Sequence, residues 1–231
     1  MLTVVQLNQF YGQSHTLWDV DLDMPQGDCL CLMGRNGVGK TTLLNCIMGL
    51  LATESGAISF DNSDIGGLQA EDRSRLGIGY VPQGRMIFPL LTVEENLRIG
   101  LPARRTPATD IPPHVYELFP VLSDMQDRRG GDLSGGQQQQ LAIGRALVLE
   151  PRLLILDEPC EGIQPSVVQQ IGDVIVELNR DHGITVLLVE QKLAFARRVA
   201  NRFAIMEKGR VMAAGQIDEL NDKLVAEYLT V

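Results

Sequence analysis

The chain has 231 residues, 45% of them apolar, so it is long enough for one large domain or two small ones and too apolar for general disorder. Its 20 basic and 29 acidic side chains give a formal net charge of −9, without a lysine-rich run that would neutralise a nucleic-acid backbone. This balance argues against nucleic acid as the main partner.

The first residues, MLTVVQLNQF, lack the basic and apolar regions of a signal peptide. No segment approaches the roughly 18 uninterrupted apolar residues of a membrane-spanning helix. Four cysteines, Cys29, Cys31, Cys46 and Cys160, lack paired C-x-x-C spacing. We therefore expect a cytosolic chain with reduced core cysteines, in which any membrane role comes through a partner.

Eight short β-type runs alternate with longer helical patterns, which predicts an α/β fold with a largely parallel sheet covered by helices. In chain order, the runs are LTVVQL (2–7), CLCLM (29–33), AISF (57–60), IGYV (78–81), LLIL (153–156), TVLLV (185–189), FAIM (203–206) and RVMAA (210–214).

A helical insertion interrupts these strands between residues 83 and 132. Thr92 and Glu95 form a good capping box there, and the later part of the insertion is interrupted by Pro102, Pro107, Pro112 and Pro113. We predict one domain over residues 1–231, with a sheet-containing core at 1–82 and 133–231 and a helical subdomain at 83–132. Near the C-terminus, one helical face should pack on the core; its residues are Ile217, Leu220, Leu224, Val225 and Tyr228.

The segment GRNGVGKTT (34–42) is typical of a phosphate loop, because it comes directly after an apolar strand and leads into a helix predicted over about residues 40–50. Glycines let backbone N–H groups converge on phosphate oxygens, and the helix start adds partial positive charge. Lys40 would reach the β- and γ-phosphates and Thr41 would hold Mg²⁺. The candidate nucleotide-binding residues are Gly34, Arg35, Asn36, Gly37, Val38, Gly39, Lys40, Thr41 and Thr42.

The segment LLILDEP (153–159) predicts a buried strand that delivers two carboxylates beside the phosphate loop. Asp157 suits an outer contact to Mg²⁺, and Glu158 suits polarising the attacking water. An acidic pair after a strand is usually a solvated turn, but the upstream loop favours the catalytic interpretation.

A second small-residue turn, LSGGQQQQ (133–140), opens a helix about ninety residues after the phosphate loop. Ser134 and the N–H groups of Gly135 and Gly136 have the chemistry to bind phosphate at a helix start. Gln138, Gln139 and Gln140 lie on the first turns of that helix, where we expect a solvated or simply packed face.

Over essentially its whole length, the chain resembles the ATP-binding subunits of ABC transporters. GRNGVGKTT, Gln83 after GYVP, LSGGQ and LLILDEP carry this resemblance, in that order and with family-like spacing. It implies a P-loop ABC ATPase fold with a mostly parallel core sheet, an antiparallel β portion and the helical insertion. It also implies that the turn Ser134, Gly135, Gly136 and Gln137 binds the γ-phosphate of ATP held by another subunit in a head-to-tail dimer.

The resemblance assigns roles to residues with weaker signals. Tyr11 matches the aromatic residue that stacks on adenine, and Gln83 matches the glutamine that touches Mg²⁺ and the attacking water. In this family the insertion forms the groove for the coupling helix of the transmembrane subunit. Phe88, Pro89 and Leu90 are either groove residues or a local hydrophobic plug.

Two segments depart from the family pattern. Glu190-Gln191-Lys192 stands where Thr-His-Asp is usual, and Gln191 cannot accept a proton near neutral pH. We therefore assign proton handling to Glu158 and phosphate positioning to the Gln191 amide. After Pro159, Glu161-Gly162-Ile163-Gln164 replaces Ser-Ala-Leu-Asp. Gln164 could supply only a weaker neutral hydrogen bond across the dimer interface.

Both departures resemble a branch of importers for branched-chain amino acids and short amides, and the motifs look closest to urea importers. The resemblance implies a peripheral subunit on the cytoplasmic face of the plasma membrane. Its partners would be transmembrane permease subunits, a second ATPase subunit that this branch commonly supplies as a different chain, and indirectly a solute-binding protein. The alternatives are a branched-chain amino acid importer ATPase, a soluble ABC ATPase acting on DNA or ribosomes, and a nucleotide-binding regulatory module.

Overall fold

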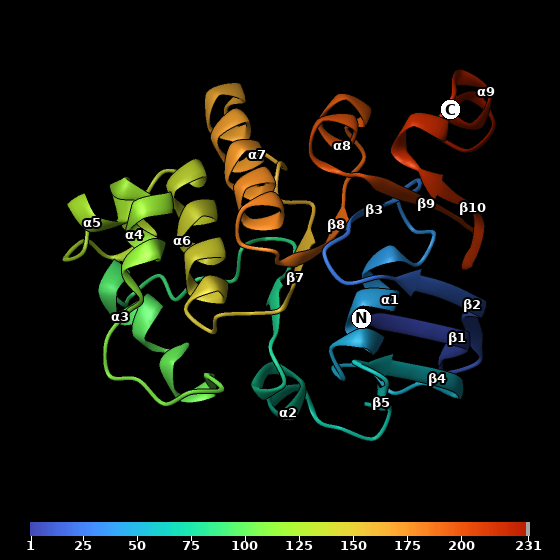
Figure 1. Ribbon diagram of the computed structural model, residues 1–231, viewed down its shortest axis with the longest axis horizontal. Helices are drawn as coiled ribbons and strands as arrows, with labels where there is room; N and C mark the ends of the chain where they lie inside the picture. Colours follow the sequence, from blue (N-terminus) through green and yellow to red (C-terminus); the bar gives the residue numbers. More distant parts are fainter. Residues whose placement is uncertain (230–231) are drawn as a thin grey trace.

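The computed structural model describes residues 1–229, which form two β-sheets with helices packed on them (Figure 1). The larger sheet has six strands in the order β10-β9-β3-β8-β7-β6, parallel except for the antiparallel pair β9 and β10. Its strands are β3 (Cys29–Met33), β6 (Ile78–Val81), β7 (Leu153–Asp157), β8 (Thr185–Val189), β9 (Arg202–Glu207) and β10 (Arg210–Gln216). This sheet confirms the predicted α/β class.

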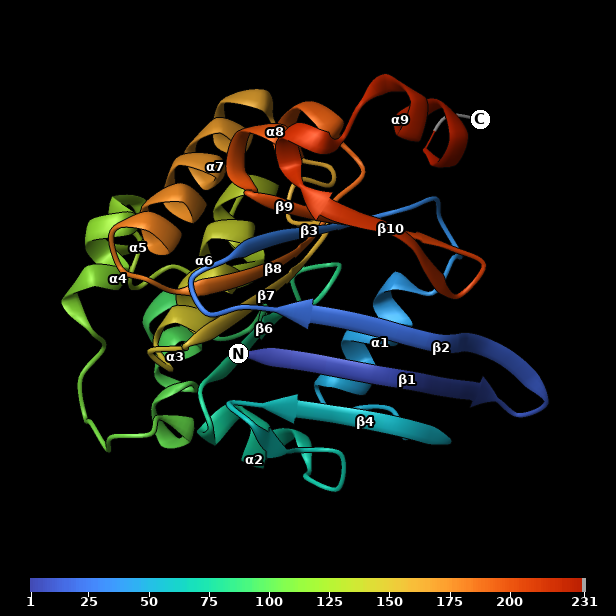
Figure 2. The same ribbon diagram turned by 45° about the vertical axis from the view of Figure 1, so that its right-hand side comes forward.

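A second sheet is antiparallel, in the order β2-β1-β4-β5, and lies beside the first (Figure 2). It consists of β1 (Leu2–Tyr11), β2 (Ser14–Met24), β4 (Ser55–Phe60) and β5 (Ser63–Asp64). The sequence runs missed β2, because its buried Leu17, Val20 and Leu22 alternate with exposed aspartates and form no continuous apolar run. Pairing with β1 makes this half-polar segment a strand.

The two faces of the larger sheet belong to different hydrophobic clusters. On β3, Leu30 and Leu32 face a cluster shared with α1 (Lys40–Ile47) and the antiparallel sheet. Cys29, Cys31 and Met33 face the cluster formed with α6 (Gly135–Leu147), α7 (Pro165–Arg180) and α8 (Leu193–Val199). The sheet is therefore buried on both faces, which explains its continuous apolar runs. Helix α1 ends before residue 50, because the left-handed Gly49 (φ 70°) comes directly after its cap.

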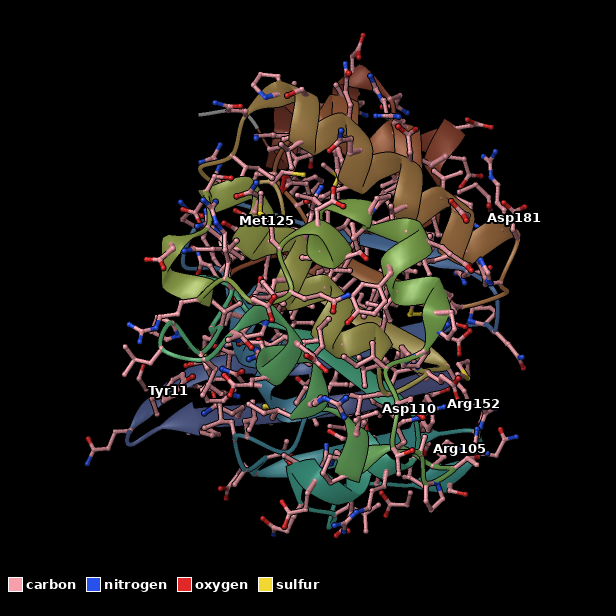
Figure 3. The ribbon with its side chains drawn as sticks, turned by 90° about the vertical axis from the view of Figure 1, so that its left-hand side faces the viewer. Tyr11, Arg105, Asp110, Met125, Arg152 and Asp181 are labelled. Atoms are coloured by element: carbon pink, nitrogen blue, oxygen red, sulfur yellow. The ribbon has the colours of Figure 1, made fainter. Side chains whose placement is uncertain are left out.

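Residues 83–132 contain short helices and no extended strand; only the isolated bridge of Thr92 with Arg129 pairs as β-structure there. The helices are α3 (Val93–Arg98), η1 (Leu101–Ala103), α4 (Pro113–Leu118), α5 (Pro120–Asp124) and η2 (Gly130–Asp132). Helices α3, α4 and α5 pack on α6, where Gly144 approaches Leu97, Val115 and Leu122. Figure 3 views this helical layer from outside, with Arg105 and Asp110 on its outer loop and Tyr11 at the opposite edge.

The C-terminal segment forms η3 (Ile217–Glu219) and α9 (Asp222–Tyr228), two short elements instead of one helix. The five apolar residues predicted to pack on the core do so, and Leu220 is buried. Helix α2 (Ala70–Arg75) leads into β6.

The four cysteines are free and buried, as expected, and burial raises the pKa of Cys29 to about 12. Within the described residues, no helix combines the length and apolar character needed to cross a membrane.

Candidate nucleotide-binding site

A cavity of about 710 Å³ opens at the carboxyl ends of parallel strands β3, β7 and β8, where ligands bind in open α/β sheets. It collects residues from the hairpin of the antiparallel sheet, the phosphate loop and the ends of three strands. Its lining residues are Tyr11, Thr16, Asn36, Gly37, Gly39, Lys40, Thr41, Thr42, Gln83, Glu158, Glu161, Glu190, Gln191 and Lys192.

The phosphate loop depends on backbone conformations that favour glycine. Gly34, Gly37 and Gly39 have φ values of 149°, 79° and 107°. A Cβ on Gly34 would collide with the carbonyl oxygen of Met206 on β9. Gly39 caps α1 without a side-chain hydrogen bond, and the first turn carries no acidic residue. The N-terminal N–H groups of α1 are therefore available to an anion.

Lys40 is buried at the floor of this loop. Its Nζ donates to the carbonyl oxygens of Gly34 (2.8 Å) and Arg35 (2.9 Å) and lies 4.0 Å from Glu158 Oε1. Burial lowers the pKa of the ammonium group, and Glu158 partly offsets this effect. The Lys40 ammonium group thus joins two carbonyl groups of the loop and also lines the cavity.

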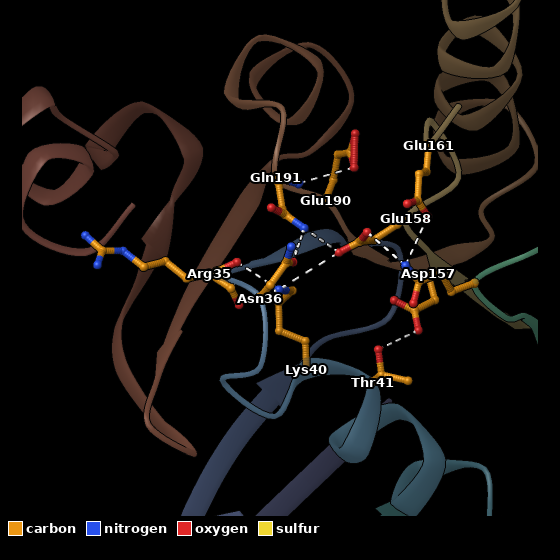
Figure 4. A network of polar contacts seen from close by, with 11 residues as sticks. Arg35, Asn36, Lys40, Thr41, Asp157, Glu158, Glu161, Glu190 and Gln191 are labelled. Carbon is orange, nitrogen blue, oxygen red and sulfur yellow. Dashed lines mark hydrogen bonds and ion pairs between the residues drawn. The ribbon is translucent and has the colours of Figure 1, made fainter. Parts of the chain in front are cut away.

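Asp157 and Thr41 meet beside Lys40 (Figure 4). Thr41 Oγ1 donates to Asp157 Oδ2 at 2.9 Å, and the buried Oδ1 has no hydrogen-bond partner. Burial raises the pKa of this carboxyl group, with the Thr41 hydrogen bond acting in the opposite direction. An unpaired carboxylate oxygen next to a hydroxyl fits a hard cation such as Mg²⁺.

Glu158 is the centre of an amide and carboxylate network (Figure 4). Gln191 Nε2 donates to Glu158 Oε1 (2.6 Å) and to Asn36 Oδ1 (2.7 Å). Gln83 Nε2 donates to Glu158 Oε2 (3.4 Å) and Glu161 Oε2 (3.0 Å). Both glutamines act as donors, so their amides hold the Glu158 carboxylate in place from two sides.

The cavity also contains residues to which the sequence assigned no role: Thr16, Glu161, Glu190 and Lys192. Glu190 is 3% exposed, and its Oε1 has no hydrogen-bond partner. Burial raises its pKa, opposed by the Gln191 N–H and the Lys192 charge. Its one available signal was its place directly after β8, at the same sheet edge as Asp157.

The turn Ser134 to Gln137 does not reach this cavity. Ser134 Oγ accepts from Gln137 N–H (3.3 Å), and Gln137 Oε1 accepts from Ser134 N–H (2.9 Å), so the turn caps itself. Ser134 and Gln137 line a separate groove of about 660 Å³ beside α7. The structure therefore separates the two expected phosphate-binding segments.

Three residues of the phosphate-loop segment do not line the cavity. Gly34 contributes its carbonyl oxygen to Lys40. Arg35 contributes its carbonyl oxygen to Lys40, and Val38 packs against the core. Of the glutamines in α6, Gln139 and Gln140 are buried, which confirms a packed face and excludes a solvated one for this pair. Gln140 Nε2 donates to Gln170 Oε1 of α7 at 3.2 Å.

A protein-family model described as "ABC transporter" matches residues 17–161. The chain is similar to the high-affinity branched-chain amino acid transport ATP-binding protein BraG of Pseudomonas aeruginosa. They are 41% identical over 215 residues, covering 92% of this chain and 91% of the relative. It is 38% identical over 221 residues to the probable branched-chain amino acid transport ATP-binding protein LivF of Archaeoglobus fulgidus, covering 95% and 94%.

Solved structures of ATP-binding cassettes also match the fold of this chain. The ATP-binding cassette MJ0796, solved as a dimer in a post-hydrolysis state bound to ADP and Pi, matches with a TM-score of 0.85 and 26% identity. The match covers 94% of this chain and 99% of that one. The fold is a P-loop ABC ATPase fold, as expected. The chain therefore belongs to the ABC transporter family, in which it is an ATP-binding subunit and an ATPase.

Proposed function

We propose that this chain hydrolyses ATP to drive an importer for branched-chain amino acids. This proposal rests on the match of the chain to BraG and LivF over more than 90% of its length, because both names specify branched-chain amino acid transport. The expected urea specificity has no support from these relatives, so the alternative drawn from the sequence is the better one. The solute does not contact an ATPase subunit, so no pocket residue reports the cargo.

Glu158 orients and polarises the attacking water in this proposal. Its carboxylate receives hydrogen bonds from Gln191 and Gln83, which restrict its rotation. Gln191 donates and does not take up a proton, so proton handling stays with Glu158. When ATP binds, Lys40 exchanges its contacts to the Gly34 and Arg35 carbonyls for the β- and γ-phosphates, and Tyr11 stacks on adenine.

Mg²⁺ would be held by Thr41, Asp157 and Gln83 together with the phosphates. The unpaired Asp157 Oδ1 and the neighbouring Thr41 hydroxyl support this assignment. Among the described residues, no group of three His, Cys, Asp or Glu side chains could form an all-protein metal site. Mg²⁺ typically relies on few protein ligands plus phosphate oxygens, whose negative charge it neutralises.

A second ATPase subunit would complete the site. The turn of residues 133–137, called the signature turn below, faces its own groove and not this chain's cavity. The relative MJ0796 was solved as a dimer with ADP and Pi. We infer that the signature turn binds the γ-phosphate of ATP held by another subunit, either a different chain or a second copy, with Gln164 near that interface.

This dimer can be tested by measuring the mass of the Glu158→Gln protein in solution at several concentrations, with and without Mg-ATP. A shift from monomer to dimer with Mg-ATP would show that two copies can close around nucleotide. A monomer that binds ATP would exclude the homodimer and direct the search to a different ATPase subunit.

The permease would contact the loop of residues 83–91, called the Gln83 loop below. Phe88 and Leu90 are 45% and 80% exposed, which favours a contact surface over a hydrophobic plug. Asn96 holds the loop by accepting from Phe88 N–H (2.8 Å) and donating to the Phe88 carbonyl (2.9 Å). Such a contact would place the subunit on the cytoplasmic face of the membrane, with a solute-binding protein acting through the permease.

Uptake measurements test the cargo. Cells lacking this chain should lose high-affinity uptake of labelled leucine, isoleucine and valine, while labelled urea uptake is unchanged. The native chain should restore uptake and the Glu158→Gln chain should not. Loss of urea uptake with normal leucine uptake would overturn the amino acid assignment.

A further inference from the structure

We propose that Arg85 and Gln138 form a polar clasp that positions the signature turn relative to the Gln83 loop. The proposal rests on the proposed function of the signature turn, since that turn acts on nucleotide held by another subunit. Neither clasp residue lines the cavity, so both are positioning residues.

Gln138 uses both ends of its amide to join two segments. Arg85 Nη1 donates to Gln138 Oε1 at 3.1 Å, and Gln138 Nε2 donates to the carbonyl oxygen of Gly130 at 3.2 Å. Gln138 lies on the first turn of α6, directly after the signature turn. A hydrogen bond from a charged donor is stronger than a neutral one, so Arg85 is the main restraint on this amide.

The guanidinium group also lies against the signature turn itself. A Cβ built on Gly135 would stand 3.1 and 3.2 Å from the two Nη atoms of Arg85, and one on Gly162 would stand 3.9 Å from Nη2. The absence of a side chain at Gly135 therefore lets the guanidinium group approach the backbone closely. Arg85 thus touches the signature turn and approaches the loop after Glu158.

The Gln83 loop has a conformation that needs external support. Arg85 and Met86 are consecutive non-glycine residues with φ values of 68° and 46°. Such left-handed residues persist when surrounding contacts impose them. Here α6 supplies the contacts at two points, because Arg145 Nη2 donates to the Met86 carbonyl at 2.8 Å in addition to the clasp. A shift of α6 must therefore change the loop.

Gln83 connects this loop to the reaction site. It donates to Glu158 and Glu161 inside the cavity and stands two residues before Arg85. When a nucleotide displaces the Gln83 amide, Arg85 moves with it because both residues belong to one short loop. The hydrogen bond from Arg85 to Gln138 then transfers this displacement to the start of α6. The clasp gives the glutamine at position 138 a function that its buried neighbours Gln139 and Gln140 do not share.

Hydrogen exchange in the full-length chain tests the clasp without requiring dimerisation. Exchange is measured for residues 37–42 and residues 135–141 at a concentration where the chain is monomeric, with and without Mg²⁺ and a non-hydrolysable ATP analogue. Protection at residues 37–42 reports nucleotide binding alone. In the native chain, exchange at residues 135–141 should change by about 10-fold, the size of one charge-assisted hydrogen bond.

Arg85→Ala and Gln138→Ala should each reduce this response to below about 2-fold while leaving nucleotide protection at residues 37–42 intact. The double variant should resemble either single variant, because both remove the same interaction. Arg85→Gln combined with Gln138→Arg should restore the response. Arg105→Ala is the matched control, since no hydrogen bond in the described structure joins the exposed Arg105 to α6, and it should respond like the native chain.

Turnover provides a second readout. In the assembled ATPase, Arg85→Ala should lower kcat by about 10-fold and leave the KM for ATP within about 2-fold. A native response at residues 135–141 in Arg85→Ala, or additive effects of the two single variants, would overturn the clasp. Failure of the proposed function looks different: the native chain would then bind nucleotide without associating with any ATPase subunit.

Discussion

The phosphate loop and the signature turn both place small residues at the start of a helix, yet the chain treats them differently. At α1, Gly39 makes no side-chain cap and the neighbouring N–H groups face a cavity. At α6, Ser134 and Gln137 cap each other and the turn faces a separate groove. The phosphate loop is surrounded by its catalytic partners, whereas the signature turn has none of these residues nearby.

Similar local chemistry therefore does not make the two segments equivalent half-sites. Asp157 and Glu158 reach Thr41 and Lys40 of the phosphate loop because β3 and β7 belong to one sheet and end at the same edge. The signature turn lies on the helical side of the molecule, beside α7. Substitutions around the phosphate loop should therefore change the rate of ATP hydrolysis most. Substitutions in the signature turn should change the free energy of unfolding most.

Glu158→Gln should have the largest effect. It keeps the size of the side chain but removes the group that handles the proton, so kcat should fall by about 10²- to 10⁴-fold while ATP affinity is retained. Steady-state hydrolysis and equilibrium ATP binding measure both quantities. The matched control is Glu161→Gln, which changes the other carboxylate bound by Gln83. The kcat of this control should stay within about 2-fold of the native value. Robust turnover by Glu158→Gln would remove Glu158 from the mechanism.

Variants of Gln191 test whether its amide acts as a donor. Gln191→Ala removes the hydrogen bond to Glu158 and should lower kcat by about 10- to 100-fold. Gln191→His retains a ring N–H donor and should keep most of the activity. Equal losses in both variants, measured as kcat at saturating ATP, would show that the amide has a geometry that a histidine cannot replace.

Gly136→Ala tests the packing of the signature turn. A Cβ at this position would stand 2.9 Å from Val167 Cγ2 on α7, and the stiff valine has little freedom to move away. Urea unfolding should show a loss of about 1–3 kcal/mol from overpacking. Gly135→Ala is the comparison variant, because its new methyl group meets the flexible end of the Arg85 side chain, which can move away, so its loss of stability should be smaller than that of Gly136→Ala. Equal stability of the two variants would contradict tight packing against α7.

Glu190→Gln should produce the smallest effect, and one that depends on pH. The folded-state pKa of Glu190 is raised above its ordinary value of 4.5, so the group contributes fully to stability below that pH and loses this contribution as pH rises through the folded-state pKa. The variant should therefore gain stability relative to the native chain over the pH range above 4.5. A difference in unfolding free energy that is constant over this range would contradict the raised pKa.

Much of this architecture can be predicted from local sequence. The runs 29–33, 153–156 and 185–189 are apolar on both faces, which predicts buried parallel strands, and all three lie in the central sheet. The phosphate loop could be located because its glycines, Lys40 and Thr41 are close together in the sequence. Strand β2 could not, because its alternating aspartates are compatible with a loop until β1 pairs with it.

Local sequence specifies the elements whose physical cause is local: buried strands, helix caps, the glycine conformations of the phosphate loop and the carboxylates at the end of β7. Which distant side chains meet depends on the tertiary structure. Gln191 reaches Glu158 and Asn36 because β8 lies between β3 and β7, and Arg85 reaches Gln138 because α6 packs against the Gln83 loop. Such contacts depend on the order of strands and the packing of helices, which no single segment encodes.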